Sequence, residues 1–358
     1  MSFRFKTDIR KFLRQERGAV AVAVAVLLTG LVGLTGAATD LGVVYTARGQ
    51  LQNAADAAAL AAAKNMFTWD ETTYEITTTP DAARATAHQF SNVNKALGNN
   101  LILLDPDYTI GLWDLDAQAF TRTGSSADPN DLNAVEVTLR KDDLANSPVT
   151  TMFAGIVGVS QVDVTAKSLA FVGFPGAIPE GGGLGIPITV KESAVTGGGD
   201  NPNCGNVLEF HSENNENASW TTFDRWPAND PTVDRFICDC YTVPWLEIGD
   251  FINIINGNLS NNTFRHLRDR FQREGIDTDG DGDADEWTVI LPVVPDGANS
   301  GSAEVRGFAT FTVTEVNTAP DKNVRGFLKC GTIIPSADTG GPNFGARASN
   351  PKLVAQIN

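Results

Sequence analysis

The stretch GAVAVAVAVLLTGLVGLTGAAT occupies residues 18–39 and contains no formally charged side chain. A helix rises 1.5 Å per residue, so a segment of this length reaches across the roughly 30 Å hydrocarbon core of a bilayer. The run has no polar stripe, which disfavours a helix buried inside a soluble domain. The sequence therefore predicts a transmembrane helix over residues 18–39.

The segment before this span is basic, although the chain as a whole is acidic. Residues 1–17 carry a formal charge of about +4, and the formal net charge of the whole chain is −16. Basic flanks remain on the cytoplasmic side of a membrane. We therefore predict a single-pass protein of the inner (cytoplasmic) membrane, with residues 1–17 in the cytoplasm and everything after Asp40 extracytoplasmic. The basic side chains of the flank are Arg4, Lys6, Arg10, Lys11, Arg14 and Arg17.

Two processing events are alternatives to an intact anchor. Small residues near positions 36–38 offer an A-x-A-like cleavage site, which would make the span a signal peptide. A prepilin-like cut after Gly18 is disfavoured, because type IV prepilins usually carry a glutamate five residues after the cut. This chain has Val22 and Ala23 in that neighbourhood.

Three glycines recur at every third position near the end of the span, namely Gly30, Gly33 and Gly36. On a helix this spacing gathers them along one side, where small residues allow a second transmembrane helix to approach closely. Glycine is also common in transmembrane helices without such a role. The spacing favours a membrane packing face, and the alternative stays open.

An alanine-dense segment, LQNAADAAALAAA, follows the span at residues 51–63. Alanine is the best helix former, so this segment should continue the membrane helix as a stalk. Together with the basic flank, the ERGAVAV string and the Asp40-Leu41-Gly42 step, it resembles the TadE/TadG-like proteins of Flp (Tad) pilus assembly. The resemblance implies a non-catalytic component of that machinery, with other Tad pilus or pseudopilin subunits as partners.

Residues 40–174 form the α+β region to which this resemblance extends more weakly. We expect a pilin-like arrangement there, in which a helix lies across an antiparallel sheet. The pattern predicts a helix at 80–97, strands at 108–113, 117–122 and 134–140, a short apolar helix at 149–158 and a strand at 162–172.

Glycine and proline are abundant in residues 175–203, which we interpret as a linker. Residues 204–358 then form a mainly β domain that holds all four cysteines, with a helix at 262–274 and strands at 287–294, 304–316 and 324–330. An even set of cysteines on the exported side favours disulfides, and four cysteines allow three pairings. Bridging the near neighbours Cys238 and Cys240 is sterically poor, so each is expected to reach Cys204 or Cys330.

The sharpest chemical motif is DTDGDGDADE at residues 277–286. Alternate carboxylates in a tightly turning loop, with Gly282 permitting the turn, match the first nine positions of a calcium loop. An EF-hand would need a glutamate at the twelfth position, where this chain has Thr288. We therefore predict a short, structural calcium site rather than a signalling EF-hand; its ligands are Asp277, Asp279, Asp281, Asp283 (through its backbone carbonyl) and Asp285.

Several function classes are disfavoured. An acidic exported region argues against nucleic acid as a partner. No HExxH, GxSxG or phosphate-binding loop occurs, so the sequence predicts no enzyme and no small-molecule substrate is evident. The alternative to pilus assembly is a calcium-stabilised, membrane-tethered adhesion or binding protein unconnected with pili.

Overall fold

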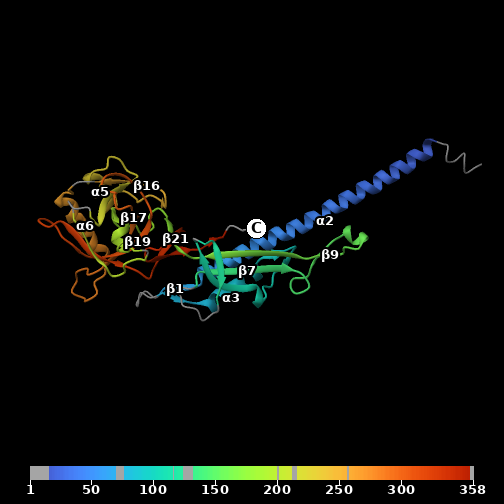
Figure 1. Cartoon of the computed structure of the whole chain (residues 1–358), viewed down its shortest axis with the longest axis horizontal. Coiled ribbons are helices and arrows are strands. Elements are labelled where there is room, and N and C mark those ends of the chain that lie inside the picture. The colour runs from blue at the N-terminus through green and yellow to red at the C-terminus, as the bar shows by residue number, and fades with distance from the viewer. Residues whose placement is uncertain are drawn as a thin grey trace, which may run out of the picture. The chain divides into compact units, whose positions relative to one another are not determined.

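The longest element of the computed structural model is helix α2, Glu16–Lys64 (Figure 1). Its sequence is dominated by alanine, leucine and valine and contains no proline, so nothing interrupts its hydrogen bonds over 49 residues. The expected span and alanine-rich stalk are thus one continuous helix.

Of the basic flank at 1–17, residues 1–15 lie outside the described part. The structure describes residues 16–69, 76–115, 117–123, 132–199, 201–211, 216–255 and 258–354.

The chain divides into two compact units, and the division passes through α2 and through several strands. The first unit comprises Met1–Ala58, Ala87–Tyr108 and Val137–Ser168. The second unit comprises Ala59–Thr86, Thr109–Glu136 and Leu169–Asn358.

A five-stranded sheet follows α2 in the chain. Its strand order is β23-β10-β7-β5-β6, and the β5–β6 and β10–β23 ladders are antiparallel. Four of these strands, β5, β6, β7 and β10, confirm the strands expected in the α+β region, whereas β23 comes from the far end of the sequence. The bounds are β5 Tyr108–Asp114, β6 Ala119–Arg122, β7 Ala134–Lys141, β10 Val164–Phe171 and β23 Lys352–Leu353.

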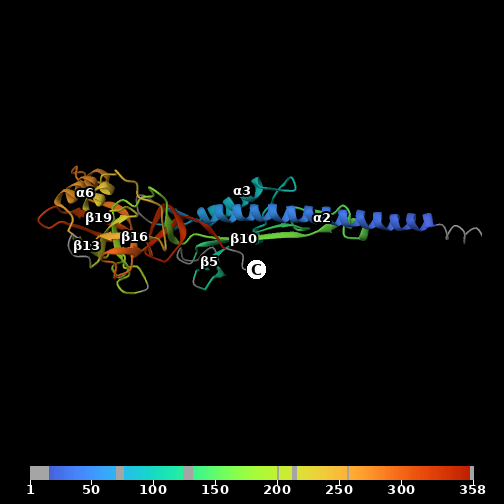
Figure 2. The same ribbon diagram turned by 90° about the horizontal axis from the view of Figure 1, so that it is seen from above.

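Within the first unit, α2 runs alongside β7 and β10 in both ribbon views (Figures 1 and 2). The Nε2 atom of Gln52 donates to the backbone carbonyl of Lys167 at 3.1 Å. A helix therefore lies against a sheet here, as the pilin-like expectation required. Shorter elements before and between these strands are α3 Pro80–Val93, η1 Asp105–Asp107, η3 Ala154–Val157 and the paired strands β1 Phe67–Trp69 with β2 Ile76–Thr78, β3 Lys95–Ala96 with β4 Asn99–Asn100, and β8 Val149–Thr150 with β9 Gln161–Val162.

The second unit is built on an eight-stranded sheet of order β13-β20-β19-β17-β12-β14-β16-β18. The β12–β17 pair is parallel and the other pairs are antiparallel. Strands β17, β19 and β20 confirm the three strands expected in the C-terminal domain. The bounds are β12 Ile188–Lys191, β13 Val207–His211, β14 Ala218–Phe223, β16 Phe251–Ile255, β17 Trp287–Val294, β18 Gly301–Glu304, β19 Gly307–Val316 and β20 Asn323–Lys329.

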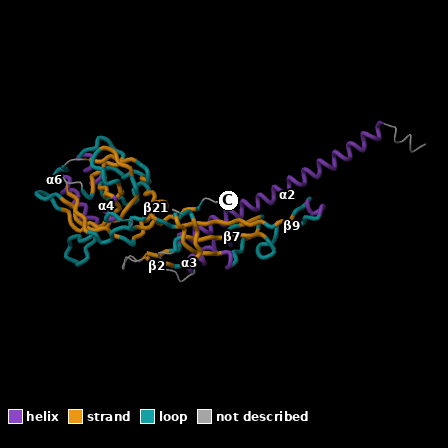
Figure 3. The backbone as a smooth tube through the Cα atoms, in the orientation of Figure 1, coloured by secondary structure: helices purple, strands orange, loops and turns teal. Residues whose placement is uncertain are grey.

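Three helices accompany this sheet: α4 Glu192–Thr196, α5 Asp230–Ile237 and α6 Asn261–Glu274. The Ser260 side chain accepts a hydrogen bond from the backbone N–H of Thr263, which caps the start of α6. Phe264 of α6 packs edge-on against Trp220 of β14, with ring centroids 5.5 Å apart. The apolar face of α6 therefore closes one side of the sheet. In the described chain after α3, strands are more extensive than helices (Figure 3).

A second sheet of the same unit has the order β15-β11-β21-β22. Its bounds are β11 Phe174–Ile178, β15 Leu246–Glu247, β21 Thr332–Gly341 and β22 Ala346–Asn350. Residues 175–203 thus contain all of β12 and α4 and all of β11 except Phe174, so the prediction of a linker there was wrong. A Cβ atom at Gly176 would lie 2.9 Å from the backbone of Gly340. This glycine serves the close approach of two strands rather than flexibility.

The cysteine pairing also differs from expectation. Cys204 is bonded to Cys330, with their Cα atoms 5.5 Å apart, and Cys238 is bonded to Cys240. The prediction that Cys238 and Cys240 each reach a distant partner was wrong. Between them Asp239 has a φ of 56°, and this left-handed residue turns the chain so that the two Cα atoms lie 5.4 Å apart.

Residues 149–158 form no α-helix. They contain β8 and the short helix η3, which lies at the tip of the hairpin that β8 forms with β9. Gly158 ends η3 with a φ of 94°, a conformation that glycine adopts readily.

Candidate functional site

Within α2, every residue from Val20 to Thr35 is exposed in the described structure. The side chains of Val20, Leu28 and Leu34 are exposed by 62%, 56% and 72%. Among the described residues, α2 is the one helix long and apolar enough to cross a membrane. The hydroxyls of Thr29 and Thr35 donate to backbone carbonyls one turn back, at 2.8 Å each. This segment thus exposes apolar side chains while it satisfies its own polar groups, as a bilayer requires.

The three glycines singled out in the sequence do not share one environment. A Cβ atom added at Gly30 or Gly33 would meet nothing within 4 Å, so both positions leave the helix surface open. At Gly36 the same atom would lie 2.4 Å from the ring of Phe153. Gly36 therefore accommodates a side chain of the same unit, and only Gly30 and Gly33 remain available to a neighbouring helix.

Asp40 is the first charged residue after the span, and its side chain organises the neighbouring loop. Its Oδ1 accepts the backbone N–H of Met152 at 2.8 Å, and its Oδ2 accepts those of Phe153 and Ala154 at 2.9 and 2.6 Å. Asp40 as a whole residue is only 6% exposed. A buried charge is tolerated when it is fully hydrogen-bonded, as here. Sequence reasoning missed this role, although the position of Asp40 at the end of the uncharged run was visible.

The second half of α2 is buried along one face. Every member of this face is at most 1% exposed: Ala47, Leu51, Ala54, Ala55, Ala58, Ala59, Ala62 and Ala63. Small side chains let a helix pack closely, which explains the alanine density of this segment.

The acidic loop lies between α6 and β17 in the second unit. It is closed at its base by a bridge in which the N–H of Ile276 donates to the carbonyl of Glu286 at 2.7 Å. Gly280 and Gly282 have φ values of 82° and 99°, which only glycine adopts without strain. The sharp turns expected at the glycines are therefore present.

Within this loop, three of the five predicted aspartates converge. Side-chain oxygens of Asp277, Asp279 and Asp285 lie within 4.8 Å of one another. Asp281 and Asp283 do not belong to this group. The side chain of Asp281 accepts the N–H of Asp283 at 2.9 Å instead. The donor set is therefore all oxygen, with Asp277 and Asp279 exposed and Asp285 half-buried. Such a set suits a hard cation such as Ca²⁺ and not a metal that prefers thiolate or imidazole ligands.

Asp285 has a pKa below its ordinary value. The hydroxyl of Thr278 donates to its Oδ2 at 2.6 Å, and the Thr278 backbone N–H donates to the same oxygen at 2.7 Å. These bonds favour the ionised carboxylate. The loop thus keeps a negative charge at the point where the three carboxylates meet.

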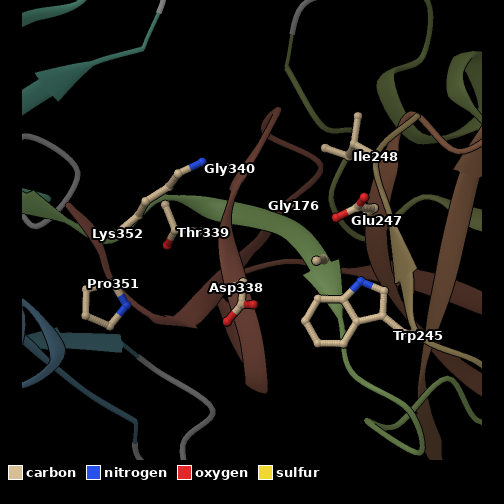
Figure 4. A pocket seen from close by; sticks show the side chains of 10 residues that line it. Gly176, Trp245, Glu247, Ile248, Asp338, Thr339, Gly340, Pro351 and Lys352 are labelled. Atoms are coloured by element: carbon tan, nitrogen blue, oxygen red, sulfur yellow. The ribbon is translucent and has the colours of Figure 1, made fainter. Parts of the chain in front are cut away.

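A pocket of about 620 Å³ opens in the second unit at the edge of the β11–β21 sheet (Figure 4). The indole of Trp245, the carboxylates of Glu247 and Asp338, and the ammonium of Lys352 line it. The Oδ1 of Asp338 accepts the side-chain amide of Asn350 at 2.9 Å. These residues come from three distant segments of the chain, so sequence spacing offered no signal for the pocket.

The comparisons with known proteins bear on the N-terminal region. Residues 18–65 match the family model Tad, "Putative Flp pilus-assembly TadE/G-like". This region is TadE/G-like. The match confirms the resemblance inferred for the anchor and stalk. It begins at the start of the predicted span and ends one residue after the last residue of α2, Lys64. No curated protein and no solved structure matches the chain. The weaker resemblance expected as far as Pro175 stays a prediction.

Proposed function

We propose that this protein is a non-catalytic, membrane-anchored component of Flp/Tad pilus assembly. The observation that carries the proposal is the Tad match over residues 18–65, which coincides with a helix that is exposed in its first half and buried in its second. The exposed half anchors the protein in the inner membrane, with the N-terminus cytoplasmic because the preceding flank is basic. The rest of the chain is an extracytoplasmic interaction domain.

The partners we propose are other Tad pilus or pseudopilin subunits. A second transmembrane helix would pack at Gly30 and Gly33, where nothing within the described structure covers the helix. Close helix contact at small residues is the usual means of association within a bilayer. Gly36 is excluded from this surface, because Phe153 occupies the space beside it.

We further propose that the acidic loop binds Ca²⁺ through Asp277, Asp279 and Asp285. Calcium takes six to eight oxygen ligands, so water or backbone carbonyls would complete the shell. The loop joins α6 directly to β17, so a bound ion would hold the end of the helix to the start of the strand. The role is structural, and it adds stability through ligand binding to the folded state alone.

The assembly role is tested by counting pili by electron microscopy in a strain that lacks the gene. We expect pili to be lost and to return with the wild-type gene. Complementation with Gly30→Leu/Gly33→Leu is expected to restore fewer pili than Val32→Leu, which changes an exposed position between the two glycines. Normal pili in the deletion strain would contradict the assembly role and favour a tethered binding protein instead.

A further inference from the structure

A second uncharged stretch lies in the first unit. Residues 144–162, between Asp143 and Asp163, contain no charged side chain. The stretch ends in the β8–β9 hairpin, which carries η3 at its tip. Met152, Ile156 and Val157 are exposed by 75%, 82% and 81%. The tip thus presents aliphatic side chains that have no hydrogen-bonding group and almost no protein cover.

The position of this tip is fixed relative to α2, within the same unit. Phe153 packs against Gly36, which belongs to the last turns of the uncharged span. Asp40, one turn further along, holds the backbone of Met152, Phe153 and Ala154. The hairpin tip is therefore attached to α2 at the point where the predicted transmembrane segment ends, and Figure 2 shows the region of the tip beside the helix.

The backbone of the tip is largely satisfied from within the unit. Apart from the three N–H groups held by Asp40, the N–H of Thr151 donates to Ser160, that of Ile156 to Phe153, that of Gly158 to Gly155 and that of Val159 to Ala154, at 3.0 to 3.2 Å. Entry into an apolar phase is costly for unpaired backbone groups and much less so for paired ones. The tip therefore meets the main requirement for contact with lipid.

We propose that the hairpin tip, residues 152–159, inserts into the bilayer at the extracytoplasmic end of the span and forms a second membrane contact. Lipid is the occupant that these observations favour, because the exposed aliphatic side chains of the tip are attached, through Gly36 and Asp40, to the end of the exposed apolar part of α2. The exposed side chains of the tip include no aromatic residue and no arginine, the anchors that dominate protein interfaces, because its one aromatic residue, Phe153, packs against Gly36. The inference rests on α2 crossing a membrane, and it does not depend on which machinery the protein serves.

A second contact has a mechanical consequence. One helix alone leaves the first unit free to tilt against the membrane surface. Two contacts, joined through Asp40 and Phe153, restrict this tilt. Within the first unit, the open positions Gly30 and Gly33 on α2 then have a defined placement relative to the second membrane contact.

The test uses the full-length protein in liposomes, with an environment-sensitive fluorophore on one introduced cysteine. All four native cysteines are in disulfides, so the introduced thiol is the one that reacts. Labels are placed at Ile156 (I156C), at Leu34 within the span, and at Val93 of α3, an exposed apolar position of the same unit. We expect the labels at 156 and 34, and not at 93, to shift to shorter emission wavelengths and to lose emission when brominated phospholipids replace ordinary ones.

The outcomes separate the inference from the anchor itself. A label at 156 that behaves like the label at 93, while the label at 34 is quenched, overturns the second contact and leaves the anchor intact. Failure of quenching at 34 overturns both. A label at 156 that is shielded from water only in native membranes, and is not quenched by brominated lipid, overturns lipid contact in favour of a protein partner.

The positioning role of Asp40 gives a further readout. In Asp40→Ala the three N–H groups lose their acceptor, so the tip is released from α2. We expect the label at 156 to lose its lipid quenching while the label at 34 keeps it. Quenching at 156 that is unchanged in this variant would show that Asp40 does not position the tip, and would overturn the proposed linkage between the two contacts.

Discussion

The exposed half of α2 and the acidic loop at 277–286 are opposite extremes of composition. The first has no charge over residues 18–39, and the second has six carboxylates within ten residues. Each presents side chains that the protein itself leaves uncovered, namely aliphatic groups in one case and clustered carboxylates in the other. The two regions differ in what can cover or neutralise these side chains. A long apolar helix surface requires a bilayer, whereas converging carboxylates require a single cation. Substitutions in the helix should therefore have effects that depend on their depth in the membrane, and the stability of the loop should depend on calcium and pH.

The largest effect is expected from a charge at the centre of the exposed helix. In Leu28→Lys an ammonium replaces an aliphatic group at the middle of the uncharged run, which costs about 3 kcal/mol of insertion free energy. We expect a clear fall in the fraction of protein that resists carbonate extraction from membranes. Val20→Lys is the matched control, because Val20 is similarly exposed but near the end of the run, where lysine can reach the headgroups. Equal behaviour of the two variants would mean that α2 does not cross the membrane.

Removal of calcium tests the other region. If the loop binds Ca²⁺, a concentration 100 times the Kd stabilises the folded protein by about 2.7 kcal/mol. We therefore expect a chelator to lower the Tm of the full-length protein in detergent, and added Ca²⁺ to restore it. Restoration by Na⁺ at the same ionic strength would attribute the effect to charge screening instead. An unchanged Tm would contradict the proposed site.

Substitution of single aspartates makes this test more specific. The motif repeats aspartate regularly in sequence, but the structure separates the aspartates that converge from those that do not. Asp279→Asn removes one charge from the converging group, and Asp281→Asn removes one from outside it. An asparagine at 281 can still accept the N–H of Asp283, so that turn should survive. Titration calorimetry should give a larger loss of Ca²⁺ affinity for Asp279→Asn. A larger loss of affinity for Asp281→Asn would mean that Asp281 is a ligand and that the loop rearranges when Ca²⁺ binds.

The two regions also show how far sequence reasoning reaches. The span, the stalk and the strands β17 and β20 follow from local periodicity and composition, which persist whatever the tertiary context. The existence of the acidic turn follows from its glycines. The sequence does not indicate which carboxylates converge, because their positions depend on the bridge between Ile276 and Glu286.

Two of the three failures depend on contacts between residues distant in sequence, and the third depends on a local backbone conformation. Gly176 suggested a flexible linker, whereas it permits close approach to Gly340. Residues 149–158 suggested an apolar helix, but Asp40 binds three of their N–H groups and a hairpin forms. The Cys238–Cys240 bond depends on the left-handed conformation of Asp239, which composition does not reveal.

The smallest effect is expected from pH, and it should be confined to the acidic loop. Asp285 has a lowered pKa in the folded protein, chiefly because Thr278 donates two hydrogen bonds to it. A carboxylate of this kind stabilises the fold above its unfolded-state pKa of about 3.9 and loses that contribution as pH falls through the lower folded-state value. In calcium-free protein, Thr278→Ala should therefore unfold at a lower urea concentration than wild type near neutral pH. The difference between the two urea midpoints should become smaller below about pH 4.

Thr314→Ala is the matched control for this prediction. Thr314 is exposed like Thr278, but its hydroxyl donates to the backbone carbonyl of Arg325, which does not titrate. The difference in urea midpoint between Thr314→Ala and wild type should thus be independent of pH. If Thr278→Ala shows the same flat profile, the hydrogen bond from the Thr278 hydroxyl does not favour the ionised form of Asp285. The loop would then differ from the apolar helix only in its affinity for a cation and not in its response to protons.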